Sequence, residues 1–140
     1  MPAMNINERD FIMVKRALII DDNRLNVDVL VHLLKGQGID SQAVLHPRNL
    51  AAVLEEEVDY QVIFLDLEMP FMDGFEVLAR LKSDGRFAGV PIVAYTVHVS
   101  EIHVAHDHGF DGFLGKPLDS DRFPEQLERI LNGESVWEAS

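Results

Sequence analysis

The stretch VIFLDLEMPFMDG, Val62 to Gly74, decides the fold of this chain. Four apolar residues in a row lead into an aspartate, Asp66, and a proline and a glycine follow it. A continuous apolar run of this length is typical of a strand that is buried on both faces, as in a parallel sheet covered by helices. Because burying a carboxylate is costly, Asp66 needs a partner or a chemical purpose at the end of that strand.

Two further apolar runs have the same character, ALIID from Ala17 to Asp21 and PIVAYT from Pro91 to Thr96. Weaker strands are expected at DSQAVL and DGFLGKP, and segments with helical spacing and capping residues separate the strands. The predicted helices cover residues 24–37, 74–83 and 100–109, and two more begin at Pro47 and Ser120. This alternation predicts a doubly wound α/β domain with a five-stranded parallel sheet and right-handed crossovers.

The chain has 140 residues, of which 47% are hydrophobic, enough for one compact domain with its own core. We expect this domain to cover residues 15–133, with tails at residues 1–14 and 134–140. Val136 and Trp137 in the second tail could form an exposed docking patch, although terminal aromatic residues more often fold back onto the domain.

Composition narrows the classes of function. A formal charge of −12 argues against direct DNA binding, because nucleic-acid phosphates would repel the chain as a whole. Cysteine is absent, which excludes disulfides and thiolate chemistry and is consistent with a cytoplasmic location. No apolar run reaches the length of a membrane span, so no membrane association is expected.

Polar side chains follow four of the predicted strands: Asp21 with Asp22, then Asp66, Thr96 and Lys116. Ligands of an open parallel sheet bind at the carboxyl ends of its strands, so these side chains are expected to share one pocket. Three carboxylates placed together repel one another, and a hard cation such as Mg²⁺ relieves that repulsion. Lys116 and the Thr96 hydroxyl would neutralise an incoming phosphoryl group, with Asp66 as the nucleophile.

Each of these residues taken alone has an ordinary explanation. A strand-end aspartate or lysine is more often a helix cap or a solvated loop charge. Several such groups after different strands, all of the types that one reaction needs, are hard to explain as independent caps. The constellation therefore favours a chemical site.

Four segments carry a resemblance to a known family: LIIDDN, FLDLEMPFMDGFEVL, PIVAYT and FLGKPL, in this order. Together they resemble the motifs of the receiver domain of two-component response regulators, over about residues 15–131. The resemblance implies a flavodoxin-like (βα)5 receiver fold of the stand-alone, single-domain type. It also implies that Asp66 is the phosphoacceptor. Mg²⁺ would be held by Asp22, Asp66 and the backbone carbonyl of Glu68, with Asp21 acting mainly through water.

The resemblance further assigns the residues that respond to phosphorylation. Thr96 would be the switch hydroxyl that turns toward the phosphoryl group, and Lys116 would pair with that group. Phe113 falls where the family places an aromatic rotamer switch.

Three neighbouring positions are expected to tune the chemistry. Glu68 and His98 occupy positions that, in the family, affect hydrolysis of the aspartyl phosphate. Val97 stands where the family usually has a small residue, so we expect slow phosphoryl exchange. His98 also begins a group of four histidines with His103, His106 and His108, for which a transition-metal site is conceivable and solvated helix residues are the preferred interpretation.

The leading hypothesis is a phosphorylation-dependent switch that catalyses only its own phosphoryl transfer and dephosphorylation. Its expected partners are a sensor histidine kinase or a histidine phosphotransfer protein and a downstream protein target, and a homodimer with a second copy is a further possibility. The resemblance implies that the fourth helix, the last strand and the fifth helix transmit the signal.

Two alternatives from other classes stay open. A Mg²⁺-dependent phosphatase similar to the haloacid dehalogenase type also uses an aspartyl phosphate, but it requires a second aspartate where this chain has Glu68. An interaction module whose phosphorylation is vestigial would bind its partner equally in all states.

Overall fold

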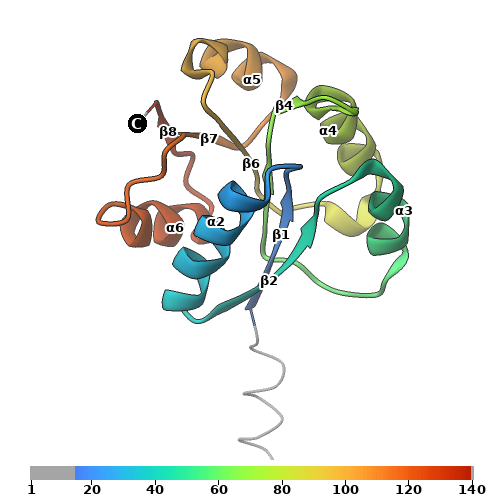
Figure 1. The fold of residues 1–140 in the computed structure, drawn as a ribbon, viewed down its shortest axis with the longest axis horizontal. Coiled ribbons are helices and arrows are strands. Elements are labelled where there is room, and N and C mark those ends of the chain that lie inside the picture. The colour runs from blue at the N-terminus through green and yellow to red at the C-terminus, as the bar shows by residue number, and fades with distance from the viewer. Residues whose placement is uncertain (1–14, 140) are drawn as a thin grey trace, which may run out of the picture.

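A computed structural model describes residues 15–139, so the expected N-terminal tail, residues 1–14, lies outside the described residues. A parallel sheet with the strand order β2-β1-β3-β6-β7-β8 forms the centre of the domain (Figure 1). Its strands are β1 (Lys15–Ile20), β2 (Ile39–Val44), β3 (Val62–Leu65), β6 (Ile92–Thr96), β7 (Gly112–Gly115) and β8 (Trp137–Glu138). The five predicted strands are confirmed as a parallel, doubly wound arrangement.

Helices cover both faces of this sheet. They are α2 (Arg24–Gly36), α3 (Pro47–Glu55), α4 (Gly74–Ser83), α5 (Ile102–His108) and α6 (Phe123–Leu131). Figure 1 shows α2 and α6 on one side and α3 and α4 on the other, with α5 above them. No helix between residues 15 and 139 combines the length and the apolar character needed to cross a bilayer.

Two apolar clusters fill the space between the layers. Leu18 and Ile20 of β1 pack toward α3 and α4, whereas Ala17 and Ile19 of the same strand pack toward α2 and α6. Successive side chains of a strand point to opposite faces, so a strand with helices on both sides must be apolar at every position. This requirement explains why the central strands appear in the sequence as unbroken apolar runs.

Local signals place the helix ends close to their predicted positions. The Asn23 side chain accepts the Asn26 N–H at 3.0 Å and begins α2, and Gly109, with φ at 98°, ends α5. The fourth helix differs at its start, because a 3-10 turn, η2 (Val99–Glu101), precedes α5. A second 3-10 turn, η1 (Gly85–Phe87), follows α4.

The strand β8 corrects the expectation of a C-terminal tail over residues 134–140. Trp137 and Glu138 pair in parallel with Phe113 and Leu114 of β7, which gives the sheet a sixth strand. Val136 is 1% exposed, so this stretch belongs to the core. A strand of two residues has no alternation that a sequence pattern can reveal, and only its partner strand defines it.

A short hairpin, β4 (Glu68–Met69) and β5 (Met72–Asp73), connects β3 to α4. A Cβ at Gly74 would lie 2.8 Å from the carbonyl oxygen of Asp66 and 2.9 Å from the Cα of Leu67. Only glycine permits this close approach, because real Cβ atoms do not tolerate such distances. The hairpin therefore returns the chain tightly beside Asp66.

Candidate functional site

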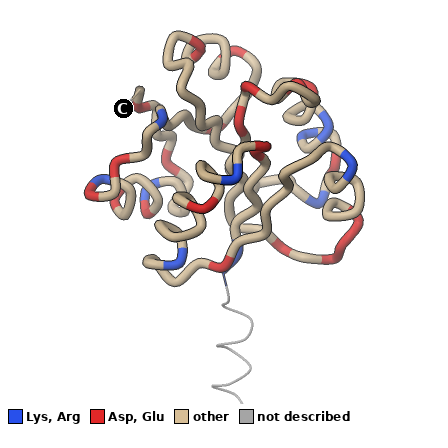
Figure 2. Tube along the Cα trace, viewed as in Figure 1, with Lys and Arg blue, Asp and Glu red and all other residues tan. Residues whose placement is uncertain are grey.

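The predicted site residues meet at the carboxyl end of the sheet. Acidic residues are spread over most elements of the described chain (Figure 2), but only at this edge do they converge. Carboxylate oxygens of Asp21, Asp22 and Asp66 lie within 4.8 Å of one another, from the ends of two neighbouring strands, β1 and β3. They border a cavity of about 410 Å³, which is lined by Asp22, Asn23, Asn26, Asp66, Glu68, Thr96, Val97 and Lys116.

Asp21 lies beneath this cavity, fully buried, and both of its oxygens already have partners. Its Oδ1 accepts the N–H of Asn23 at 2.9 Å. Its Oδ2 accepts hydrogen bonds from the Tyr95 hydroxyl at 2.8 Å and from Lys116 Nζ at 2.9 Å. Asp21 thus has less freedom to bind a cation directly than Asp22, to which no residue in the described part of the chain donates a hydrogen bond.

Tyr95 is a site residue that sequence reasoning missed. Its ring is 1% exposed, and Lys116 Nζ lies 4.2 Å from the ring centroid, within the range of a cation–π contact. Burial and the neighbouring Asp21 carboxylate raise the pKa of the Tyr95 phenol above its usual range, so it remains a neutral donor. The signal in the sequence was a tyrosine inside a buried strand, because a buried hydroxyl requires a hydrogen-bond partner.

Asp66 is 5% exposed and carries a charge that its surroundings satisfy only in part. Its Oδ1 accepts the N–H of Glu68 at 3.1 Å, and Lys116 Nζ lies 3.6 Å from its Oδ2. Burial raises the pKa of Asp66 to about 7; Asp21 adds to this rise, while Lys116 and the Glu68 N–H oppose it. The site would therefore gain stability from a further positive charge near Asp66.

The donor set fits a magnesium ion. Three carboxylates at one edge offer the hard oxygen ligands that Mg²⁺ prefers, and the described residues contain no other group of three or more potential metal ligands. Asp22 is partly exposed, and burial raises the pKa of Asp66, so a cation beside these carboxylates would favour their charged form. The histidines take other contacts: the His106 ring lies 5.1 Å from that of Trp137, and the His108 ring lies 4.4 Å from that of Phe75.

The remaining predicted residues surround the site at different depths. Thr96 is fully buried, and its Oγ1 accepts the N–H of His98 at 3.2 Å. Val97 is 60% exposed and lines the cavity, whereas the exposed His98 contributes its backbone and does not line it. Phe113 is fully buried in the apolar cluster that includes residues of α3, α4 and α5, and it does not line the acidic cavity.

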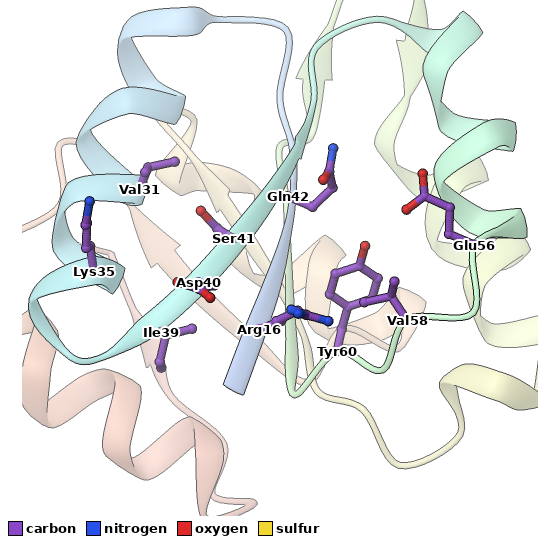
Figure 3. A pocket seen from close by; sticks show the side chains of 10 residues that line it. All are labelled: Arg16, Val31, Lys35, Ile39, Asp40, Ser41, Gln42, Glu56, Val58 and Tyr60. Carbon is purple, nitrogen blue, oxygen red and sulfur yellow. The ribbon is translucent and has the colours of Figure 1, made fainter. Parts of the chain in front are cut away.

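A larger surface cavity, of about 540 Å³, lies at the opposite end of the sheet (Figure 3). It follows the edge strand β2, and none of the predicted site residues lines it. Arg16 and Lys35 face this cavity together with Asp40 and Glu56, so its charges are mixed. The structure therefore separates this larger cavity from the acidic site.

Comparisons with known proteins agree with this geometry. The model of the response regulator receiver domain matches residues 17–128. The chain is 27% identical to hybrid signal transduction histidine kinase L of Dictyostelium discoideum, covering 84% of this chain but 7% of that protein. It is 25% identical to the polar-differentiation response regulator DivK of Brucella anthropi, covering 85% of this chain and 98% of that protein.

Among solved structures, the fold is similar to a receiver domain of a sensor histidine kinase from Pseudomonas aeruginosa PAO1, which holds a magnesium ion in its active-site cleft. The TM-score is 0.73 at 23% identity, over 85% of this chain and 98% of that one. The chain spans only 7% to 15% of the length of the first hybrid and plant histidine kinases that it matches. With the family model covering most of the chain and the acidic site at the expected edge, this protein belongs to the response regulator receiver domain family.

Proposed function

We propose that this chain is a phosphorylation-dependent switch of a two-component phosphorelay, which accepts a phosphoryl group from a phosphohistidine on Asp66. The observation that carries the proposal is the position of Asp66, which lies on the floor of the acidic cavity with Lys116 Nζ 3.6 Å from its Oδ2. Catalysis in the proposed function is limited to the chain's own phosphoryl transfer and dephosphorylation.

In the proposed step, a carboxylate oxygen of Asp66 attacks the phosphorus atom while the bond between phosphorus and the histidine nitrogen breaks. The imidazole leaves with the electron pair of that bond, and an aspartyl phosphate remains. Mg²⁺, held by Asp22, Asp66 and the Glu68 carbonyl, with Asp21 acting through water, would neutralise charge on the phosphoryl oxygens. Deprotonated Asp66 is the reactive form, and Lys116 together with the cation would favour that form against the burial that raises the pKa of Asp66.

The new dianionic group then attracts Lys116 and the Thr96 hydroxyl. Lys116 is shared between Asp21 and Asp66 before transfer, so a small movement brings it to the phosphoryl oxygens. The Tyr95 hydroxyl keeps a hydrogen bond on Asp21 when Lys116 departs, which prevents an unpaired buried carboxylate. Phe113 is proposed to change rotamer together with Thr96. Glu68, Val97 and His98 are proposed to set the lifetime of the aspartyl phosphate.

Members of this family work with histidine kinases or phosphotransfer proteins, and we propose such a protein as the phosphodonor. A downstream protein target and a homodimer in the phosphorylated state complete the proposed partners, and direct DNA binding is not part of the proposal. The cytoplasmic location stays a prediction.

Intact mass tests this function. We expect one base-labile phosphoryl adduct after incubation of the chain with acetyl phosphate and Mg²⁺, and none with Asp66→Asn or with a chelator. Absence of an adduct would overturn the switch and favour the constitutive interaction module. Sustained turnover of small phosphate esters would favour the phosphatase instead.

A further inference from the structure

The strand β8 covers the edge of β7, which would otherwise be the open edge of the sheet. Phe113 N–H donates to the Val136 carbonyl at 2.7 Å, and Trp137 and Glu138 lie in register with Phe113 and Leu114. Figure 1 shows β8 beside β7 at the end of the sheet, between α5 and α6. The chain's own C-terminal segment therefore occupies the surface between the fourth helix, the last predicted strand and the fifth helix.

The β7 strand is shaped to receive another backbone. A Cβ at Gly112 would lie 2.9 Å from the Val136 carbonyl oxygen, and a Cβ at Gly115 would overlap the Ala139 carbonyl. Two glycines in a four-residue strand weaken it as a strand unless something approaches closely. Here the close approach is that of residues 136–139.

Side chains beside β7 anchor the added segment at two points. The Trp137 ring lies 5.1 Å from the His106 ring of α5. Glu138 pairs with Arg122 and, at 3.4 Å, with Arg129, and it accepts a hydrogen bond from Gln126 at 3.0 Å. Gln126 is 3% exposed and the Glu138 side chain is 18% exposed, so the hydrogen bond between them is largely shielded from water, whereas the two arginines are partly exposed.

The same segment touches the backbone that leads into the phosphorylation site. Gly115 precedes Lys116, whose backbone N–H donates to the Thr96 carbonyl at 2.9 Å. The space a Cβ would take at Gly115 is bounded by Ala139 on one side and by the Val99 side chain, at 3.0 Å, on the other. Movement of Thr96 and Lys116 toward a phosphoryl group would thus shift the contact with Ala139 directly, with no side chain between.

We propose that the β7 edge, with Arg122, Gln126 and Arg129, is a docking site for an extended protein segment that carries an aromatic residue followed by a carboxylate. Residues 136–139 of the chain hold this site closed, and phosphorylation of Asp66 loosens them. Strand addition supplies backbone hydrogen bonds, and the aromatic and carboxylate positions supply specificity. This inference rests on the proposed function, because it takes Asp66 as the phosphoacceptor.

The test uses the full chain, in which Trp137 is the sole tryptophan. Beryllofluoride with Mg²⁺ mimics the phosphoryl group, and ¹⁹F NMR of the same sample reports whether it is bound. We expect activation to make Trp137 several-fold more accessible to acrylamide and to speed amide exchange of residues 136–139 about tenfold. Glu138→Gln should give both changes without activation. Glu125→Gln, which removes a carboxylate 3.8 Å from Arg129 outside β8, should give neither.

A peptide tests the docking site itself. The peptide ESVWEAS, which copies residues 134–140, is titrated into ¹⁵N-labelled activated chain. We expect saturable chemical-shift changes at the amides of β7. These changes should be absent with the peptide ESVSQAS and much weaker in the unactivated chain. If beryllofluoride binds but the accessibility of Trp137 stays the same and the peptide shifts no amides, this inference alone is overturned. Absence of bound fluoride overturns the proposed function and this inference with it.

Discussion

The Tyr95 hydroxyl donates a 2.8 Å hydrogen bond to Oδ2 of Asp21, the same oxygen that Lys116 contacts at 2.9 Å. Two donors on one buried carboxylate oxygen allow one of them to leave without exposing an uncompensated charge. In the proposed function Lys116 moves toward the phosphoryl group on Asp66, and the Tyr95 bond would make that movement less costly.

Tyr95→Phe should therefore lower the free energy of unfolding by about 1.5–3 kcal/mol, the usual contribution of a hydrogen bond to a charged group. It should also slow phosphorylation by acetyl phosphate several-fold, because Lys116 then becomes the sole side chain that donates to Asp21 among the described residues. Urea denaturation and intact-mass time courses measure the two effects. Tyr60→Phe is the control, because Tyr60 is also buried, at 5% exposed, but lies at the other cavity. Equal phosphorylation rates in the two variants would contradict the role of Tyr95.

The raised pKa of Asp66 predicts a dependence of stability on pH. Below about pH 4 the carboxyl is protonated in both the folded and the unfolded chain. Between about 4 and 7 only the folded chain keeps the proton, so stability falls as the pH rises. The shift from 3.8 to about 7 corresponds to at most about 4 kcal/mol, at about 1.36 kcal/mol per pKa unit.

Asp66→Asn removes this penalty. Without divalent cations, the variant should be more stable than the original chain at pH 8, and the difference should shrink toward pH 4. Mg²⁺ at pH 8 should raise the melting temperature of the original chain more than that of the variant. Calorimetry over this pH range measures both effects, and parallel pH profiles for the two proteins would rule out a raised pKa at Asp66.

Lys116→Met should leave two buried carboxylates without their shared cation. Breaking a buried ion pair in this way typically costs about 3–5 kcal/mol, and the pKa of Asp66 should rise further because Lys116 lowers it. Lys82→Met is the control: Lys82 forms an ion pair with Asp111 at 3.8 Å, and both side chains are more than 40% exposed. We expect that variant to lose no more than about 1 kcal/mol. Chemical denaturation without Mg²⁺ measures the free energy of unfolding of both variants. A similar loss of stability in both would contradict the claim that Lys116 stabilises two buried carboxylates.

Val97→Ala should speed phosphorylation by acetyl phosphate and hydrolysis of the adduct a few-fold, because Val97 lines the mouth of the cavity. Stability should change little, since the side chain is 60% exposed. Val104→Ala removes a comparably exposed valine on α5 and should alter neither rate. Intact-mass time courses give both rates. Unchanged rates in Val97→Ala would refute the expectation that this side chain limits access.

Much of the fold could be predicted because its signals are local. Apolar runs such as Val62–Leu65 mark strands buried on both faces, and Asn23 and Gly109 mark helix ends through hydrogen bonding and backbone conformation. Asp66 and Lys116 could be placed in one site because parallel strands bring their carboxyl ends to one edge. Their assigned roles in phosphoryl transfer stay predictions, to be decided by the experiments above.

Other features depended on contacts between residues far apart in the chain. The bond from Tyr95 to Asp21 joins two strands that are not neighbours in the sheet, and β8 exists only because Gly112 and Gly115 leave room for a second backbone. The sequence by itself determined which segments are strands and helices, because propensity, apolar periodicity and capping act over a few residues. Only the tertiary structure decided which buried polar groups pair and which edge the C-terminal segment covers, because those free energies arise when distant segments exclude water together.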